Sequence, residues 1–122
     1  MKKGTYVDGF IISIPKKSTA KYKKIATEAC AVWKKFGALD YKECIIDDAK
    51  PKYVALTFSK LAKPKAGEAV WFSFITFKNK KHRDEVNKKV MAYFDKKYGT
   101  SMDMPFDMSR FSYAGFKVMV GM

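Results

Sequence analysis

Two segments of this chain are apolar on both faces when they are read as β-strands, and that feature limits the possible folds most. Successive side chains of a strand point to opposite faces of its sheet, so a strand that is apolar on both faces must be covered on both. Both segments are also rich in aromatic and β-branched residues, which favour strands. In residues 6–14, Tyr6, Phe10, Ile12 and Ile14 alternate with Val7 and Ile11; in residues 69–77, Val70, Phe72 and Phe74 alternate with Trp71, Ile75 and Phe77.

Two further segments carry apolar residues at intervals of three and four, which predicts helices. The first is capped by Ser18 or Thr19 and ends at Gly37, and the second is capped by Asn79 and ends at Gly99. The pattern predicts no other long helix. The residues expected to point inward are Tyr22, Ile25, Ala26, Ala29, Val32, Trp33 and Phe36 in the first helix, and Val86, Val90, Met91 and Phe94 in the second.

The remaining pattern completes the order strand, helix, strand, strand, helix, strand. Residues 39–46 and the residues from Phe111 to Val120 are the other predicted strands. Between 49 and 67 the chain is irregular, with a piece at 57–61 that is either a strand or a helical turn; a connection of this length suggests an excursion that covers part of the molecule. The order is that of the ferredoxin-like α+β fold, a four-stranded antiparallel sheet with two helices on one face. The length predicts a single domain over residues 1–122.

Two helices cover only one face of such a sheet, so the other face needs a different cover. Left bare, an apolar sheet face would exceed the few hundred Å² of contiguous apolar surface that monomeric proteins expose. Two-fold homodimers are the commonest protein oligomers. We therefore expect a homodimer in which the uncovered sheet faces pack against each other.

The formal net charge of +13 raises a different possibility, a nucleic-acid-binding module. In that hypothesis lysines contact phosphates, and sheet aromatics such as Trp71 and Phe74 stack on RNA bases. Of the 25 basic residues, however, only Arg83 and Arg110 are arginines, and the lysines occur as scattered pairs that also fit solvated helix faces. Nucleic acid is therefore the alternative partner rather than the first expectation.

Location and cofactors are constrained mainly by what the sequence lacks. No apolar run reaches the roughly 18 residues that cross a bilayer, so no membrane partner is expected. Lys2-Lys3 precede an apolar stretch, but Asp8 and Ser13 interrupt it, so the segment is interpreted as the first strand rather than a signal peptide and a cytoplasmic protein is expected.

The two cysteines, Cys30 and Cys44, predict reduced thiols rather than a disulfide framework. His82 is the single histidine, and no repeated Cys or His spacing, phosphate loop or dinucleotide fingerprint occurs. We therefore expect neither a metal site nor a cofactor.

Five polar residues are candidates for orienting a ligand. Asp8 interrupts an apolar strand, where a carboxylate needs a partner; that partner is a ligand, Arg110, a backbone amide, or water at a sheet edge. Asp107 and Arg110 stand three apart before the last strand, where Arg110 can hold a carboxylate or phosphate, or the two can fix a turn. Glu43 enters only as the neighbour of Cys44, whose thiol it would make less reactive. The candidates are Asp8, Ser73, Asp107, Arg110 and Tyr113.

Several short motifs are spread through nearly the whole chain. The most specific is Met104-Pro105-Phe106-Asp107 followed by Arg110 and Gly115-Phe116; the others are Tyr6-Val7-Asp8-Gly9-Phe10, Glu43-Cys44 and Phe72-Ser73-Phe74-Ile75. Together they resemble the YbaA-like family of small bacterial proteins, a domain of unknown function, although Ser112 and Ala114 depart from its pattern. That family is similar to the dimeric α/β-barrel group, in which two ferredoxin-like protomers bring their sheets together around a central space. The resemblance implies a dimer and supplies no activity.

The functional hypothesis follows from the expected fold and the candidate residues. We expect a dimeric binding module, or a cofactor-independent enzyme, that holds a small, partly apolar molecule between the sheet and its loops. Whether there is any catalysis is left open; the chemistry available is proton transfer through Asp8 or Asp107. RNA binding and a purely structural role are the alternatives.

Overall fold

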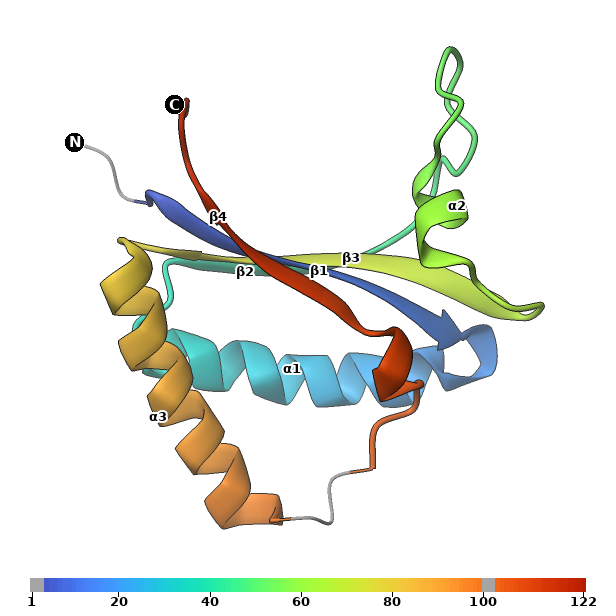
Figure 1. The fold of residues 1–122 in the computed structure, drawn as a ribbon. Helices are drawn as coiled ribbons and strands as arrows, with labels where there is room; N and C mark the ends of the chain where they lie inside the picture. The colour runs from blue at the N-terminus through green and yellow to red at the C-terminus, as the bar shows by residue number, and fades with distance from the viewer. Residues whose placement is uncertain (1–3, 100–102) are drawn as a thin grey trace.

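The computed structural model describes residues 4–99 and 103–122. It contains a four-stranded antiparallel sheet in the order β2-β3-β1-β4, with the two long helices on one side of it (Figure 1). This arrangement confirms the predicted ferredoxin-like α+β fold. The elements are β1 Tyr6–Pro15, α1 Thr19–Lys35, β2 Asp40–Ile45, α2 Phe58–Ala62, β3 Glu68–Phe77, α3 Lys80–Tyr98 and β4 Ser112–Lys117, with 3-10 turns at Lys16–Ser18 and Met108–Arg110.

The ends of the long helices follow the predicted capping residues. The Asn79 side chain accepts a hydrogen bond of 2.8 Å from the backbone N–H of His82, which satisfies a free donor in the first turn of α3. Ser18 occupies the cap position of α1 without a side-chain bond, while the Thr19 hydroxyl donates to the Lys16 carbonyl at 2.7 Å. Gly37 and Gly99 follow the two helices with positive φ angles of 111° and 58°.

β1 and β3 are each one residue longer than predicted, and three other segments differ from the sequence prediction at both ends or in type. The undecided piece at 57–61 is a helix, α2, capped by the Thr57 hydroxyl, which accepts a bond from the Lys60 N–H. The strand predicted at 39–46 spans 40–45. The last strand ends at Lys117 instead of Val120, because its partner β1 begins at Tyr6 and one further bond, from the Val118 N–H to the Thr5 carbonyl, closes the ladder.

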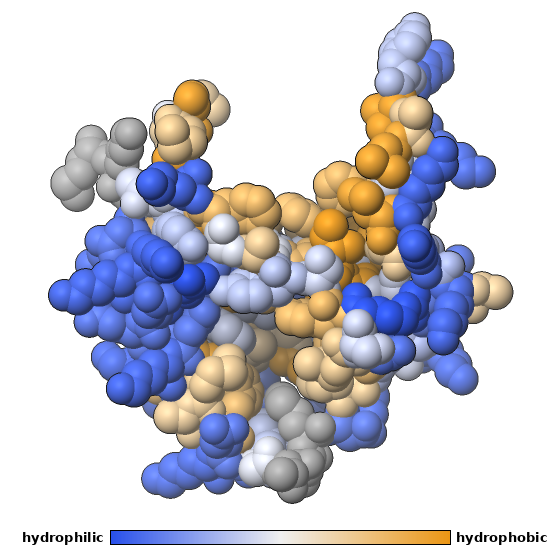
Figure 2. All heavy atoms as spheres, viewed as in Figure 1, coloured by the Kyte–Doolittle hydropathy of each residue, from blue (hydrophilic) through white to orange (hydrophobic). Residues whose placement is uncertain are grey.

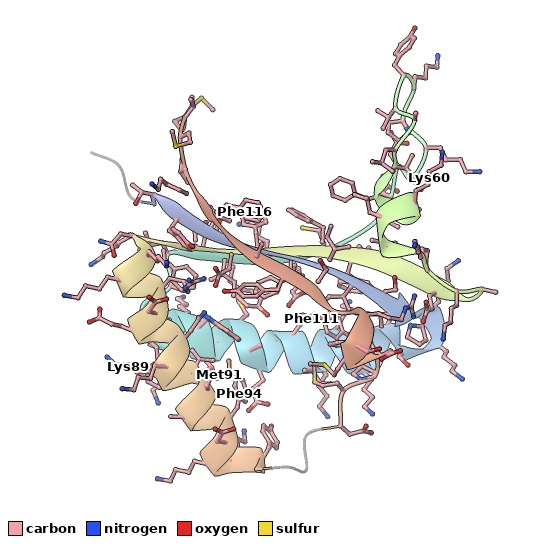
Figure 3. All side chains as sticks on the ribbon, in the orientation of Figure 1. Lys60, Lys89, Met91, Phe94, Phe111 and Phe116 are labelled. Carbon is pink, nitrogen blue, oxygen red and sulfur yellow. The ribbon has the colours of Figure 1, made fainter. Side chains whose placement is uncertain are left out.

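The side of the sheet that α1 and α3 cover holds the core, and we call it the helix side. Ile12, Ile14 and Trp71 pack there with Tyr22 of α1, and Ile75 and Phe77 pack with Val32 of α1 and with Val86 and Val90 of α3. Figure 3 shows Phe111 and Phe94 on this side of the sheet. The residues that were predicted to share a strand face therefore do so.

The opposite side of the sheet is only partly covered, and we call it the open face. At one end, α2 and the neighbouring loop bury Ser13 and Val70. Elsewhere Phe72 and Phe116 keep 40% and 57% of their surface exposed, and Figure 3 shows Phe116 projecting on this side. Figure 2 shows hydrophobic atoms on the segments that rise above this face and on the floor between them. No helix among the described residues is both long and apolar enough to cross a membrane.

Candidate functional site

One row of side chains crosses the helix side of the sheet through all four strands. Glu43 of β2 pairs with Ser73 of β3, Ser73 pairs with Phe10 of β1, and Phe10 pairs with Tyr113 of β4. Because the paired residues of neighbouring strands point to the same side, the register brings the Glu43 carboxylate beneath α1.

The Glu43 carboxylate accepts three hydrogen bonds from hydroxyl groups. The Tyr22 hydroxyl of α1 donates to Oε1 at 2.8 Å, the Tyr41 hydroxyl donates to Oε2 at 2.6 Å, and the Ser73 hydroxyl donates to Oε1. Burial, and then the charge of Glu43, raise the pKa of both tyrosines, so each phenol stays protonated and donates. Within the described residues, no lysine or arginine forms an ion pair with Glu43.

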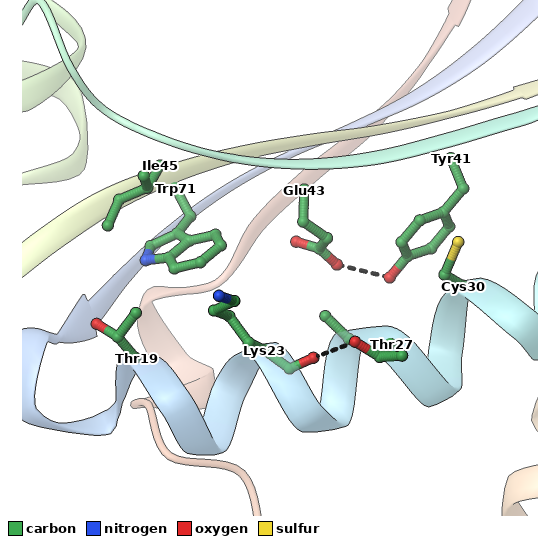
Figure 4. A pocket seen from close by; sticks show the side chains of 9 residues that line it. Thr19, Lys23, Thr27, Cys30, Tyr41, Glu43, Ile45 and Trp71 are labelled. Atoms are coloured by element: carbon green, nitrogen blue, oxygen red, sulfur yellow. Dashed lines mark hydrogen bonds between the residues drawn. The ribbon is translucent and has the colours of Figure 1, made fainter.

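Two cavities meet at Glu43. The outer one, a groove of about 510 Å³ between α1 and the strands β2 and β3, is drawn in Figure 4. The inner one, about 140 Å³, lies between α1, the sheet and the loop that precedes β4, and it is almost entirely apolar. Ala26, Tyr41 and Glu43 line both. The outer groove is lined by Thr19, Lys23, Ala26, Thr27, Cys30, Tyr41, Glu43, Ile45 and Trp71, and the inner cavity includes Phe10, Tyr22, Trp33, Ser73, Met104, Phe106 and Phe111.

Trp71 forms part of the wall of the outer groove. Its indole Nε1 is buried and has no hydrogen-bond partner within residues 4–99 and 103–122. A buried N–H without an acceptor costs roughly 1–3 kcal/mol, so such groups are uncommon outside functional sites. The groove is lined by a carboxylate and by an apolar indole ring whose nitrogen lies on the side away from Glu43, and the Lys23 side chain extends into it from α1 (Figure 4).

Asp8 and Tyr113 belong to a different cluster, which is centred on Arg83 of α3. Arg83 Nη1 donates to Asp8 Oδ1 at 2.7 Å and to the Tyr113 hydroxyl at 2.6 Å, and the Arg83 guanidinium stacks on the Tyr6 ring. The Asn87 amide donates to Asp8 Oδ2 at 3.2 Å. Asp8 is fully buried, so its partners are Arg83 and Asn87 instead of Arg110 or water.

Arg110 and Asp107 each have structural partners at the far end of the sheet. Arg110 Nη1 and Nη2 donate to the two carboxylate oxygens of Glu68 at 3.0 Å and 2.9 Å, and Nη2 also donates to the Lys63 carbonyl at 2.8 Å. The Asp107 carboxylate accepts from the Ser109 N–H and hydroxyl, which holds the pKa of Asp107 below its usual value. The Asp107 carboxylate therefore caps the 3-10 turn at Met108–Arg110 through its bonds to Ser109.

The five residues predicted to orient a ligand do not form one cluster. Ser73 lines the inner cavity; Asp8 and Tyr113 surround Arg83, and Asp107 and Arg110 hold the loop before β4. Glu43 has the central position that sequence reasoning missed. Alternation could have found it, because Tyr41, Glu43 and Ile45 share one face of β2 and Tyr41 is an aromatic residue expected to point inward.

The aromatic residues named for base stacking lie on different sides of the sheet. Trp71 is buried on the helix side, where it packs against Tyr22. Phe74 lies half-buried on the open face next to Phe72. No group of three or more His, Cys, Asp or Glu side chains that could hold a metal ion occurs in residues 4–99 and 103–122.

Comparisons with known proteins agree with one another on family and fold. Residues 5–108 match the family model described as "Protein of unknown function (DUF1428)". The chain is 36% identical over 116 residues to proteins named "Uncharacterized protein YbaA" from Escherichia coli strain K12 and from Shigella flexneri, a match that covers 94% of this chain and 97% of theirs. A crystal structure of a dimeric ferredoxin-like protein from an uncultured marine organism superposes with a TM-score of 0.54, at 9% identity, over 97% of this chain and 99% of the other.

Proposed function

Because the chain belongs to the DUF1428 family of proteins of unknown function, its activity must be argued from its own side chains. We propose that it is a homodimeric protein that binds a small, partly apolar molecule at Glu43, in the groove between α1 and the edge of the sheet. The observation that carries this proposal is the Glu43 carboxylate, which lines both cavities and is held by three neutral hydroxyl groups without a cation of its own in the described residues.

The donors around Glu43 indicate what the ligand brings. A carboxylate offers about four lone-pair sites, and hydroxyl groups occupy three of them. A ligand with an amine or another strong donor would complete the set, and its positive charge would pair with a carboxylate that forms no ion pair within the described residues, although the Lys23 side chain lines the same groove. Its apolar part would lie against the rings of Tyr41 and Trp71.

Any proton transfer in this site falls to Glu43. A general base must reach the bound molecule directly or through one water. Asp8 is enclosed by Arg83 and Asn87, and Asp107 is bonded to Ser109; neither lines the groove or the inner cavity. The proposal therefore moves the acid–base role from Asp8 and Asp107 to Glu43.

The homodimer is supported by the open face. Phe72 and Phe116 are exposed there beside Phe74, which is more apolar surface than a sheet face in water normally carries. The dimeric state of the marine protein of similar fold also favours this assembly. A partner on the open face would leave the groove at Glu43 accessible, because the groove is on the other side of the sheet.

Binding is tested with 2-phenylethylamine as the probe, because it joins an ammonium group to a small apolar body. We expect it to shift the indole N–H resonance of Trp71 more than that of Trp33, whose N–H is bonded to Asn87. Glu43→Gln should weaken binding by roughly ten-fold or more, because it removes the charge and keeps the shape. Asp40→Asn makes the same change on the open-face side of β2 and should leave binding unchanged.

The proposal fails on either of two results. One is equal affinity of the wild type and Glu43→Gln for the amine. The other is binding of 3-phenylpropionate, which has the same apolar body and the opposite charge, as tightly as the amine.

A further inference from the structure

The connection between β2 and β3, residues 46–67, rises from one end of the open face as an arm (Figure 1). Its base is anchored: the Ser13 hydroxyl donates to the Ala62 carbonyl at 3.4 Å, and the Phe58 ring lies 6.2 Å from that of Phe72. Further out, Tyr53 is completely exposed and Leu56 is 63% exposed. Apolar side chains on a projecting segment with so little of their own chain to contact indicate an outside partner.

The residues after β4, 118–122, form a tail that rises from the other end of the same face (Figure 1). The Val118 N–H makes the last backbone bond to β1, at 2.9 Å to the Thr5 carbonyl. Met119 and Val120 then expose 79% and 93% of their surface. The arm and the tail thus stand as two apolar walls with the open face between them (Figure 2).

The exposed apolar surface is large enough for a stable interface. Taking roughly 150–250 Å² for a fully exposed large side chain, the arm, the tail, Phe72 and Phe116 together expose on the order of 1,000 Å². A standard interface buries about 800 Å² on each partner. One second copy of the chain would therefore cover this surface without help from another protein.

We propose that in the homodimer the arm of each protomer packs against the tail of its partner. This inference rests on the proposed homodimer and specifies how it is held. When two copies meet face to face about a two-fold axis parallel to the sheets and perpendicular to the line from arm to tail, each arm lies over the partner's tail. Residues from both copies then enclose the space between the sheets.

The charges favour this arrangement over one in which the arms meet. The arm carries five lysines (Lys50, Lys52, Lys60, Lys63 and Lys65) against two aspartates (Asp47 and Asp48), which gives it a net charge of +3. The Lys60 ammonium, labelled in Figure 3, donates a hydrogen bond of 2.7 Å to the Ala55 carbonyl of the arm itself. Two arms side by side would bring like charges together, whereas residues 118–122 carry no charged side chain. An arm can therefore contact the partner's tail without the electrostatic repulsion that it would meet at the partner's arm.

Two variants with acidic substitutions test the pairing. Val54→Asp with Leu56→Asp alters the arm, and Met119→Asp with Val120→Asp alters the tail; all four side chains are exposed, so the protomer should fold. Each variant should dimerise more weakly than the wild type by roughly ten-fold or more in sedimentation velocity. Met91→Asp with Ala92→Asp places the same charge change at two exposed apolar positions of α3, on the other side of the sheet, and should leave dimerisation unchanged.

The decisive measurement is the mixture of the two variants, with one of them labelled with ¹⁵N. A heterodimer keeps one unaltered arm on one unaltered tail, whereas each homodimer keeps none, so native mass spectrometry should find the heterodimer in excess over the statistical fraction. A mixture that shows only the statistical fraction overturns the pairing of arm with tail, and so does a variant that dimerises like the wild type. A wild type that is monomeric instead overturns the homodimer itself, and the inference with it.

Discussion

The helix side and the open face are built from alternate residues of the same strands, yet their side chains are satisfied very differently. On the helix side Asp8 is completely buried and each of its carboxylate oxygens accepts a hydrogen bond, and Ile75 and Phe77 pack beneath the helices. On the open face Phe72, one residue from Trp71, remains exposed. Alternate positions of one strand thus serve different purposes: one set builds the core of the protomer, and the other set is left for the association with a second copy that we propose.

The largest expected effect concerns the buried ion pair of the helix side. Arg83→Ala should lower the free energy of unfolding by about 3–5 kcal/mol, because it leaves the Asp8 carboxylate buried without its cation. Lys42 and Asp40 form the matched pair on the open-face side of β2, where both are exposed. Lys42→Ala should have no measurable effect in the same urea titration. If the two variants lost similar stability, the contrast between the faces would not hold.

The next prediction compares apolar residues on the two faces of β3. Ile75→Ala should cost about 2–5 kcal/mol in protomer stability, since it leaves a cavity in the core. Phe72→Ala should cost the protomer much less and should instead weaken the dimer. Urea unfolding at low protein concentration and sedimentation at high concentration separate the two effects. If Phe72→Ala destabilises the protomer as much as Ile75→Ala does, then Phe72 belongs to the core of the protomer and the proposed difference between the two faces is wrong.

The smallest expected effect concerns the contact that joins the two regions. Arg110 of the loop before β4 binds Glu68 and also the Lys63 carbonyl of the arm. The hydrogen bonds from Arg110 lower the pKa of Glu68, against the opposing effect of burial. The stability from this contact is therefore present above the ordinary glutamate pKa of about 4.3 and is lost as pH falls through the lowered value.

Glu68→Gln should accordingly be less stable than the wild type at neutral pH and should lose less stability on acidification. Free energies of unfolding measured at neutral pH and at successively lower pH values test this. A variant whose stability falls with pH as steeply as that of the wild type would contradict the assignment.

The fold was predictable because its signals are local. Asn79, Gly37 and Gly99 mark helix ends through their own backbone and side-chain preferences, and strict alternation assigned the faces of β1 and β3. The end of the last strand was not predictable in this way. It depends on where the antiparallel partner β1 begins, at Tyr6, near the other end of the chain.

The polar clusters were less predictable because their members meet only through strand register and helix orientation. Asp8 was recognised as needing a partner, but Arg83 lies 75 residues away on α3. Glu43 meets Ser73 because β2 and β3 pair in one particular register, and it meets Tyr22 because α1 crosses above them. Sequence spacing specifies neither contact, so the candidate site had to be located in three dimensions.

The reactivity of Cys44 tests most directly whether a second copy covers the open face. Cys44 is exposed and pairs with Phe72 on that face, so in a Cys30→Ser variant it is the single reporter thiol. If a second copy covers the open face, the rate at which Cys44 reacts with a thiol reagent should fall as protein concentration rises and the dimer forms. A rate that stays constant over the whole range, with the protein sedimenting as a monomer, would contradict this expectation.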